Sequence, residues 1–135
     1  MKDPTDSLQV AFYGALNGQL AYAWKTYPVY ASPQASDDFV VIGDVNVLDD
    51  GTDTTFGSQC AVSFDIVTRA TSWNPANAVA TQLMEIIVGR MPVVDGFTVT
   101  VTPYLDSIVH FTESRETKLI YRKLVRIILK LRENG

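Results

Sequence analysis

Two stretches of the sequence contain residue types that bind nucleotides or cations in other proteins. The first is FVVIGD, an apolar run that stops at Gly43 and Asp44, as the first strand of a nucleotide-binding unit does. Such a unit needs spaced glycines and a helix directly after the strand. Here Gly43 is followed by DVNVLDDG, which has neither feature. We therefore interpret the run as a plain sheet strand, in which Gly43 marks a bulge or a close backbone approach.

The second stretch is the acidic sequence DDGTD, which contains Asp49, Asp50 and Asp53. Oxygen-rich loops of this kind bind calcium when a glycine stands at position 6 of the loop and a glutamate at position 12. Counted from Asp49, those positions hold Thr54 and Cys60, so the calcium motif is incomplete. We interpret the stretch as a solvated turn between two strands. The alternative is weak cation binding at an interface between assembled proteins.

Residue types that perform catalysis are few and isolated in this sequence. Cys60 is the only cysteine and His110 the only histidine, which excludes an intrachain disulfide and a multi-cysteine metal site. Cys60 alternates with apolar residues, so we expect a buried thiol, and we expect His110 to be a core or rim residue. Asp44, Asp65 and Asp106 could meet across a sheet face, but an acid–base pair also needs split pKa values, which nothing in the sequence requires. We predict no catalytic residue, no cofactor and no bound metal.

Charge is distributed unevenly along the chain, whose formal net charge is −4. Residues 1–111 contain twelve acidic and four basic side chains, and residues 112–135 contain three acidic and seven basic ones, so the two parts carry −8 and +4. An acidic chain is a poor candidate for wrapping nucleic acid, because that affinity depends on neutralising phosphates. One basic edge on an acidic body is better suited to self-association or to docking with another protein.

The basic side chains near the C-terminus are the most informative charge feature. They are Arg115, Lys118, Arg122, Lys123, Arg126, Lys130 and Arg132. Three interpretations are open: a solvated strand face that also protects a sheet edge from aggregation, pairing with an acidic subunit or partner, and contact with nucleic acid. Few aromatic residues lie between these charges, which disfavours the last interpretation. The residues that we predict at a subunit or partner interface are Arg122, Arg126, Lys130, Arg132, Asp49, Asp50 and Asp53.

Two helices are indicated by apolar spacing and by a proline near each start. Asp3-Pro4 and Asn74-Pro75 have the pattern of an N-cap residue followed by proline at the first helical position. Apolar residues then recur at helical spacing, which predicts helices over residues 5–18 and 75–88. Gly89 is the expected stop of the second helix.

Alternating and β-branched residues predict four strands. They are Phe39–Val47, Gln59–Arg69, a stretch that begins at Phe97, and residues 119–132. Pro103 in the third strand predicts a bulge or a sheet edge. Residues 19–38 contain proline, serine and aspartate, and we expect an irregular connection there.

The resulting order α-β-β-α-β-β predicts an α+β fold. We expect a two-layer sandwich in which two helices cover one face of a mainly antiparallel sheet. The 135 residues fit a single domain, residues 1–135, because domains hold about 100–200 residues. No run reaches the about 18 unbroken apolar residues of a membrane span. The N-terminus lacks the apolar segment of a secretory signal, so we expect the chain to fold in the cytoplasm.

The order of these segments, from residue 7 to residue 132, resembles the tail-completion family of long-tailed bacteriophages, which comprises tail terminators and head–tail joining proteins. Val29-Tyr30 and then Pro33-Gln34 stand where that family has a short segment before its first strand, and FVVIG is similar to that strand. Thr68-Arg69-Ala70 matches the exit from the second strand, and Asp95-Gly96 precedes the later strand pair. The approach ASDD departs from the family, where this approach is proline-led.

The resemblance implies a structural role without enzymatic activity. Proteins of this family form rings, commonly hexameric, that cap the finished tail tube and join it to the head, with DNA passing through the lumen without specific binding. The implied partners are further copies of the chain, the tail tube protein and the head–tail connector protein. The implied location is the tail or neck of a virion that is assembled in the cytoplasm of a bacterial host.

Three other functions are compatible with the sequence. A head-side neck connector or stopper ring would share the layout and differ in its position in the particle. A small cytosolic enzyme that uses His110 and aspartate chemistry would lose its activity when these residues are replaced. A nucleic-acid-binding module would bind in a way that weakens steeply with salt.

Overall fold

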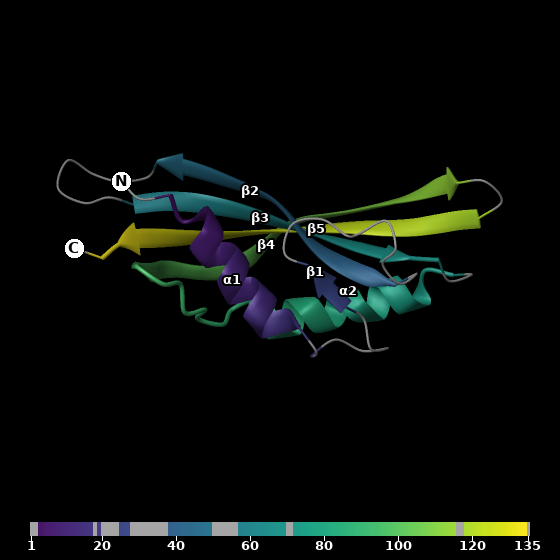
Figure 1. The fold of residues 1–135 in the computed structure, drawn as a ribbon, viewed down its shortest axis with the longest axis horizontal. Helices are drawn as coiled ribbons and strands as arrows, with labels where there is room; N and C mark the ends of the chain where they lie inside the picture. Colours follow the sequence, from purple (N-terminus) through teal and green to yellow (C-terminus); the bar gives the residue numbers. More distant parts are fainter. Residues whose placement is uncertain are drawn as a thin grey trace.

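The computed structural model of the chain describes residues 3–17, 19, 25–27, 38–49, 57–69, 72–115 and 118–134. Within them the chain forms two helices and five strands (Figure 1). In chain order these are α1 (Thr5–Leu16), β1 (Lys25–Tyr27), β2 (Phe39–Asp49), β3 (Gly57–Thr68), α2 (Asn74–Ile87), β4 (Phe97–Arg115) and β5 (Lys118–Glu133). Neither of these helices is long and apolar enough to cross a membrane.

The strands form one sheet in the order β1-β2-β3-β5-β4, with both helices packed on the same face (Figure 1). β1 runs parallel to β2, and every other neighbouring pair is antiparallel. The predicted α+β sandwich and its order of helices and longer strands are therefore confirmed. β1 lies within residues 19–38, for which we predicted an irregular connection. Three residues are too few to show a strand periodicity, and it is pairing with β2 that makes this segment a strand.

The sheet has a helix face, against which α1 and α2 pack, and an outer face on the other side. The helix face carries the hydrophobic core, to which β3 and β5 contribute Cys60, Val62, Phe64, Ile66, Val125, Ile127, Leu129 and Leu131. Phe12 of α1 meets Phe64 edge to face, with the ring centroids 5.6 Å apart. Each large side chain buried there contributes about 1.5–3 kcal/mol. Cys60 is fully buried, as predicted, and this burial raises the pKa of its thiol.

Each helix begins one residue away from its predicted cap. The capping positions are Pro4 and Trp73 rather than Asp3 and Asn74, and neither makes a side-chain cap hydrogen bond. The Asp3 carboxylate still accepts hydrogen bonds from the hydroxyl of Thr5 at 2.6 Å and from its backbone N–H at 2.9 Å. These bonds, the hydroxyl bond most, lower the pKa of Asp3. Proline is compatible with a helix start because the first N–H groups have no partner within the helix.

The predicted irregularity at Gly43 is confirmed. β2 and β3 shift register between Ile42 and Val45. A Cβ atom at Gly43 would lie 3.3 Å from the backbone oxygen of Ser63 on the partner strand. A side chain at this position would therefore press on β3, which favours glycine at the bulge.

The prediction for Pro103 is confirmed as well. Pro103 lies on the edge strand β4, where the register shifts between Val101 and Tyr104. Its carbonyl accepts a hydrogen bond from the backbone N–H of Gly89 at 2.9 Å. Gly89 has a φ of +74°, the left-handed conformation that is common directly after a helix. The end of α2 is therefore tied to the bulged part of β4.

Candidate assembly interface

The outer face, which neither α1 nor α2 covers, is the candidate functional surface. The register of the sheet places every second residue of β5 on it. These residues are Ile120, Arg122, Leu124, Arg126, Ile128, Lys130 and Arg132. Apolar and basic side chains thus alternate along the face, whereas a sheet face in contact with water is ordinarily polar. β5 therefore has apolar residues on both faces, as strands that are covered on both faces do.

Partly buried apolar side chains of β5, Leu124 and Ile128, lie opposite exposed apolar side chains of β4. Val101 and Tyr104 are 38% and 42% exposed, and Tyr104 lies opposite Ile128. Val109 is 52% exposed and lies opposite Leu124. We term Val101, Tyr104 and Ile128 together the apolar cell. The outer face therefore presents apolar surface at two places along the β4–β5 pair.

Arg122 links three strands across the outer face. Its guanidinium binds both carboxylate oxygens of Asp65 on β3, through Nη2 and, at 3.4 Å, through Nε. Its Nη1 donates to the carboxylate of Glu113 on β4, and its guanidinium carbon lies 5.3 Å from the ring centroid of Phe111. The hydrogen bond with Asp65 is the main reason that the pKa of Arg122 is raised. The group is therefore a fixed cation held between two carboxylates.

Arg126 forms a looser pair with Asp106. Its Nε lies 3.3 Å from Oδ2 of Asp106, which is within ion-pair distance. The geometry is not that of a hydrogen bond, and Nε is buried without a hydrogen-bond partner among the described residues. Both side chains are 41% exposed, and pairs of this kind contribute about 0–1 kcal/mol because solvent screens them. We therefore treat this pair as a charge contact of small energy.

The four basic residues that we predicted at an interface all lie on the outer face. Arg122 and Arg126 pair with carboxylates as described, whereas Arg132 is exposed near the end of β5. Lys130 lies beside the apolar cell, opposite Val101. The sequence does not reveal this pairing, since Arg122 and its partner on β3 are 57 residues apart. The positive charge on the outer face is thus partly neutralised by carboxylates of the same chain.

Lys123, which belongs to the same basic series, lies on the helix face instead. Its amino group donates to the side-chain oxygen of Asn77 on α2. Close by, the ring of Trp73 meets those of His110 and Tyr121 edge to face, at centroid distances of 5.2 Å and 4.9 Å. His110 is exposed, so it is a rim residue rather than a core residue.

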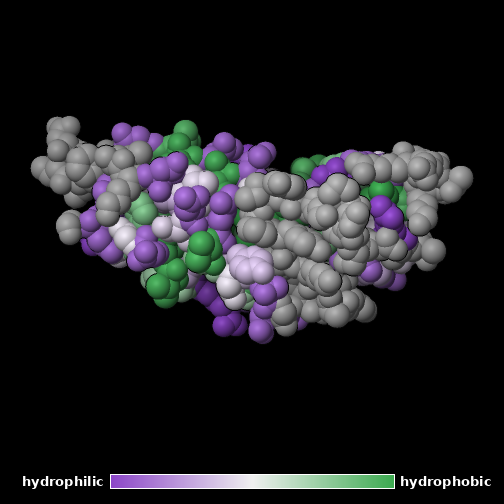
Figure 2. Space-filling model, in the orientation of Figure 1, coloured by the Kyte–Doolittle hydropathy of each residue, from purple (hydrophilic) through white to green (hydrophobic). Residues whose placement is uncertain are grey.

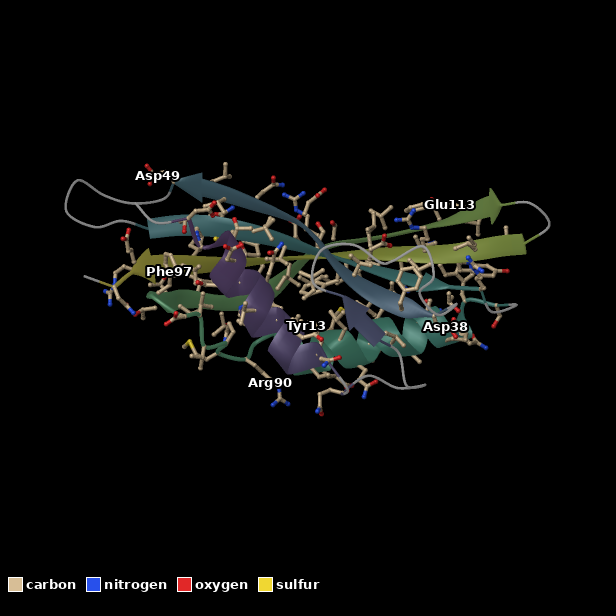
Figure 3. The ribbon with its side chains drawn as sticks, in the orientation of Figure 1. Tyr13, Asp38, Asp49, Arg90, Phe97 and Glu113 are labelled. Carbon is tan, nitrogen blue, oxygen red and sulfur yellow. The ribbon has the colours of Figure 1, made fainter. Side chains whose placement is uncertain are left out.

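The predicted acidic residues are not gathered on the outer face. Asp49 ends β2 opposite Ser58, which lies on the helix face together with Cys60. Figure 3 shows Asp49 and Glu113 at opposite ends of the sheet. Asp50 and Asp53 lie outside the described residues. The structure therefore does not bring Asp49 together with the Arg122 ion pairs.

The residues considered for metal binding and for acid–base chemistry are dispersed in the described part of the chain. Within the part of the chain that the structure describes, no three His, Cys, Asp or Glu side chains are placed to hold a metal ion. Of the aspartates considered for acid–base chemistry, Asp65 and Asp106 pair with different arginines. Asp44 is exposed beside the bulge of β2.

In the part of the chain that the structure describes, the protein is thus a two-layer α+β fold in which neither α1 nor α2 covers the outer face of the sheet. No family model and no curated protein matches it. Among solved structures it is similar to a chain of the virion of a native gene transfer agent particle. The two chains are 18% identical and superpose with a TM-score of 0.82, over 98% of this chain and 99% of the other. They therefore share a fold over almost their whole lengths.

Proposed function

We propose that this chain is a structural protein of a phage-like virion, and that it forms the ring that terminates the tail tube and joins it to the head connector. The observation that carries this proposal is the fold shared with a chain of a gene transfer agent virion, over 98% of this chain and 99% of that one. A likeness across both lengths supports a similar role more strongly than a likeness to one part of a larger protein.

The outer face supports association of several copies into a ring. A chain of 135 residues is too small to encircle a DNA duplex alone, so the ring is assembled head to tail. A closed ring of this type, for which we propose a hexamer, needs two different surfaces that complement each other. The outer face, with its alternating apolar and basic side chains, is one of them. Acidic side chains that lie away from the outer face, in the part of the chain that carries −8 over residues 1–111, supply the other.

The basic side of this contact is supplied by β5. We centre the contact with an acidic neighbour on Arg132, which is exposed near the end of β5, and on Lys130, which lies on the same face two residues before it. Asp49, together with Asp50 and Asp53 of the β2–β3 connection, is our proposed acidic counterpart. Exposed charge pairs of this kind set the orientation and rate of association more than its strength.

The proposed ring contacts the tail tube protein on one side and the head–tail connector protein on the other. DNA passes through its lumen without specific binding, which an acidic chain favours by repelling phosphates. The place of the protein is then the tail or neck of the virion, after assembly in the cytoplasm of the bacterial host. Neither a cofactor nor a catalytic step is part of this role.

Molar mass in solution is the first test of the ring. We would measure it by light scattering over a concentration series, with and without magnesium, and image the largest species by electron microscopy. The proposal predicts a closed ring with a central hole, formed by the chain alone or at the end of a tail tube. A chain that stays monomeric and does not bind tail-tube ends would contradict it.

Labelling of the protein in particles distinguishes a tail terminator from a head-side connector or stopper ring. Intact particles and detached tails would be compared with the same label. A label that remains on detached tails supports the terminator, whereas a label that remains on the heads supports the connector.

A further inference from the structure

The connection between α2 and β4 displays two large apolar side chains to solvent. Met91 is 63% exposed and Val93 is 89% exposed, the highest value for a large hydrophobic side chain among the described residues. Figure 2 shows hydrophobic atoms gathered over this connection. We term residues 91–93 the apolar loop. A single exposed apolar residue needs no explanation, but two of them with a proline between them form a small protruding surface.

Hydrogen bonds on both sides hold the apolar loop in place. Before it, the N–H of Gly89 donates to the carbonyl of Pro103, and Nε of Arg90 donates to a backbone carbonyl of α2, both at 2.9 Å. After it, Val94 is only 3% exposed, and its carbonyl accepts a hydrogen bond from the N–H of Phe97 at 3.0 Å. A segment fixed in this way loses little conformational entropy when it binds. The loop is therefore pre-organised to present its two side chains.

The outer face carries a surface that complements the apolar loop. The apolar cell lies between Arg126 and Lys130 along β5, so its apolar side chains are flanked by basic ones. The apolar loop follows directly on the exposed Arg90 and is followed by Val94 and the exposed Asp95, and Glu85 is exposed on the preceding helix, so these flanking residues carry a net charge of −1. Beside the apolar cell, Arg126 pairs with Asp106 and Lys130 leaves a net charge of +1. The two surfaces thus match in apolar character, and the net charges beside them are opposite in sign.

One chain cannot bring these two surfaces into contact. Val94 joins the core on the helix face, which places the apolar loop on the helix side of the sheet, whereas the apolar cell lies on the outer face. Two complementary surfaces on different sides of one chain are what head-to-tail association requires. We therefore propose that the apolar loop of one copy docks on the apolar cell of the next copy. The inference rests on the proposed ring and names the contact that closes it.

Engineered cysteines test this contact in the full-length chain. The double variant Val93→Cys, Tyr104→Cys is oxidised mildly and separated on a denaturing gel. Because Cys60 is fully buried, the native thiol does not compete. We expect a ladder of covalent oligomers that ends at the size of the ring. An equal mixture of the two single variants should give covalent dimers and nothing larger, since each chain then has one reactive site.

Val10 provides a matched control, because it is 72% exposed and lies on α1, outside both surfaces. The double variant Val10→Cys, Tyr104→Cys should give no ladder under the same oxidation. A ladder from this pair as strong as that from Val93 would overturn the proposed contact, since the cross-linking would then be unspecific.

Serine variants give a second measurement that involves no oxidation. Val93→Ser should weaken association about tenfold, because an apolar side chain is lost from the contact, and Val10→Ser should leave association unchanged. If rings form, no ladder is seen and both serine variants associate equally, the contact is wrong while the proposed function stands. If the unaltered chain assembles neither alone nor on tail-tube ends, the proposed function has failed, and the contact fails with it.

Discussion

The two faces of the sheet are made by the same strands but by different kinds of contact. On the helix face, Val125, Ile127 and Leu129 of β5 are fully buried against the core. On the outer face, the residues between them alternate apolar with basic side chains, and two of the arginines form ion pairs. The helix face therefore carries the main hydrophobic core, whereas the outer face is the surface that we propose for contact with another molecule. Strand alternation identifies the side chains that share a face. It does not show whether other parts of the folded chain cover that face.

The largest difference is expected when apolar side chains are shortened on the two faces. Phe64→Ala should lower the free energy of unfolding by about 3–5 kcal/mol, because it opens a cavity in the core and removes the ring contact with Phe12. Ile128→Ala should lower it by at most about 1 kcal/mol in the separate subunit. Urea unfolding at a concentration where the chain is monomeric measures both values. Equal losses would show that the outer face is part of the subunit core.

The next largest difference in unfolding free energy is expected between the two arginine ion pairs of the outer face. Arg122→Met should cost about 1–2 kcal/mol of unfolding free energy, because it leaves the partly buried carboxylate of Asp65 without its cation. Arg126→Met is the matched control and should cost less than about 1 kcal/mol, since its pair is half exposed. A double-mutant cycle with Asp65→Asn isolates the pairing energy. A coupling energy between Arg122 and Asp65 as small as that between Arg126 and Asp106 would contradict our assignment of the Arg122 pair as the stronger one.

Gly89 tests the connection between α2 and the bulged part of β4, and Gly14 in α1 is the control. Gly89→Ala should cost about 1 kcal/mol, because Gly89 has a φ of +74° that an alanine adopts with strain. Gly14→Ala in α1 should instead stabilise the chain by about 0.5–1 kcal/mol, since a Cβ there meets nothing within 4 Å. Thermal unfolding of the two variants measures both effects. Shifts of the same sign would contradict this account.

The smallest expected effect concerns the buried thiol of the helix face. Because burial raises the pKa of Cys60 above its ordinary value of 9.0, the folded chain retains the thiol proton at a pH where the unfolded chain has lost it. The thiol therefore contributes fully to stability below pH 9.0 and loses that contribution as the pH rises through the raised value. Unfolding measured from neutral to alkaline pH should show a steeper decline for the unaltered chain than for Cys60→Val. Equal slopes would mean that the thiol is not desolvated.

Elements with long patterns are predicted well from this sequence. The expected helix over residues 75–88 is found at Asn74–Ile87, and the strand expected over residues 119–132 is found at Lys118–Glu133. Apolar positions recur often enough in both segments to fix their period. β1 is too short to have a period, and its pairing with β2 depends on the fold as a whole.

The candidate interface is only partly predictable, for a different reason. The common face of Arg122, Arg126, Lys130 and Arg132 follows from their even spacing along one strand. The carboxylates that neutralise two of them come from β3 and β4, so they follow from the register between strands. The exposure of Val93 likewise depends on how the end of α2 is tied to β4. Contacts between distant segments thus decide which of these residues remain open to another molecule.

The central claim is that another copy of the chain binds the outer face, and its most direct test compares the assembly of two chains. We would measure molar mass by light scattering, over one concentration series with and without tail-tube ends, for the unaltered chain and for Ile128→Ser, and would check that both are fully folded under these conditions. The account predicts that the unaltered chain forms a ring, alone or in the presence of tail-tube ends, while Ile128→Ser remains largely monomeric under the same conditions. Rings formed equally well by both chains would contradict the assignment of the outer face as the assembly surface.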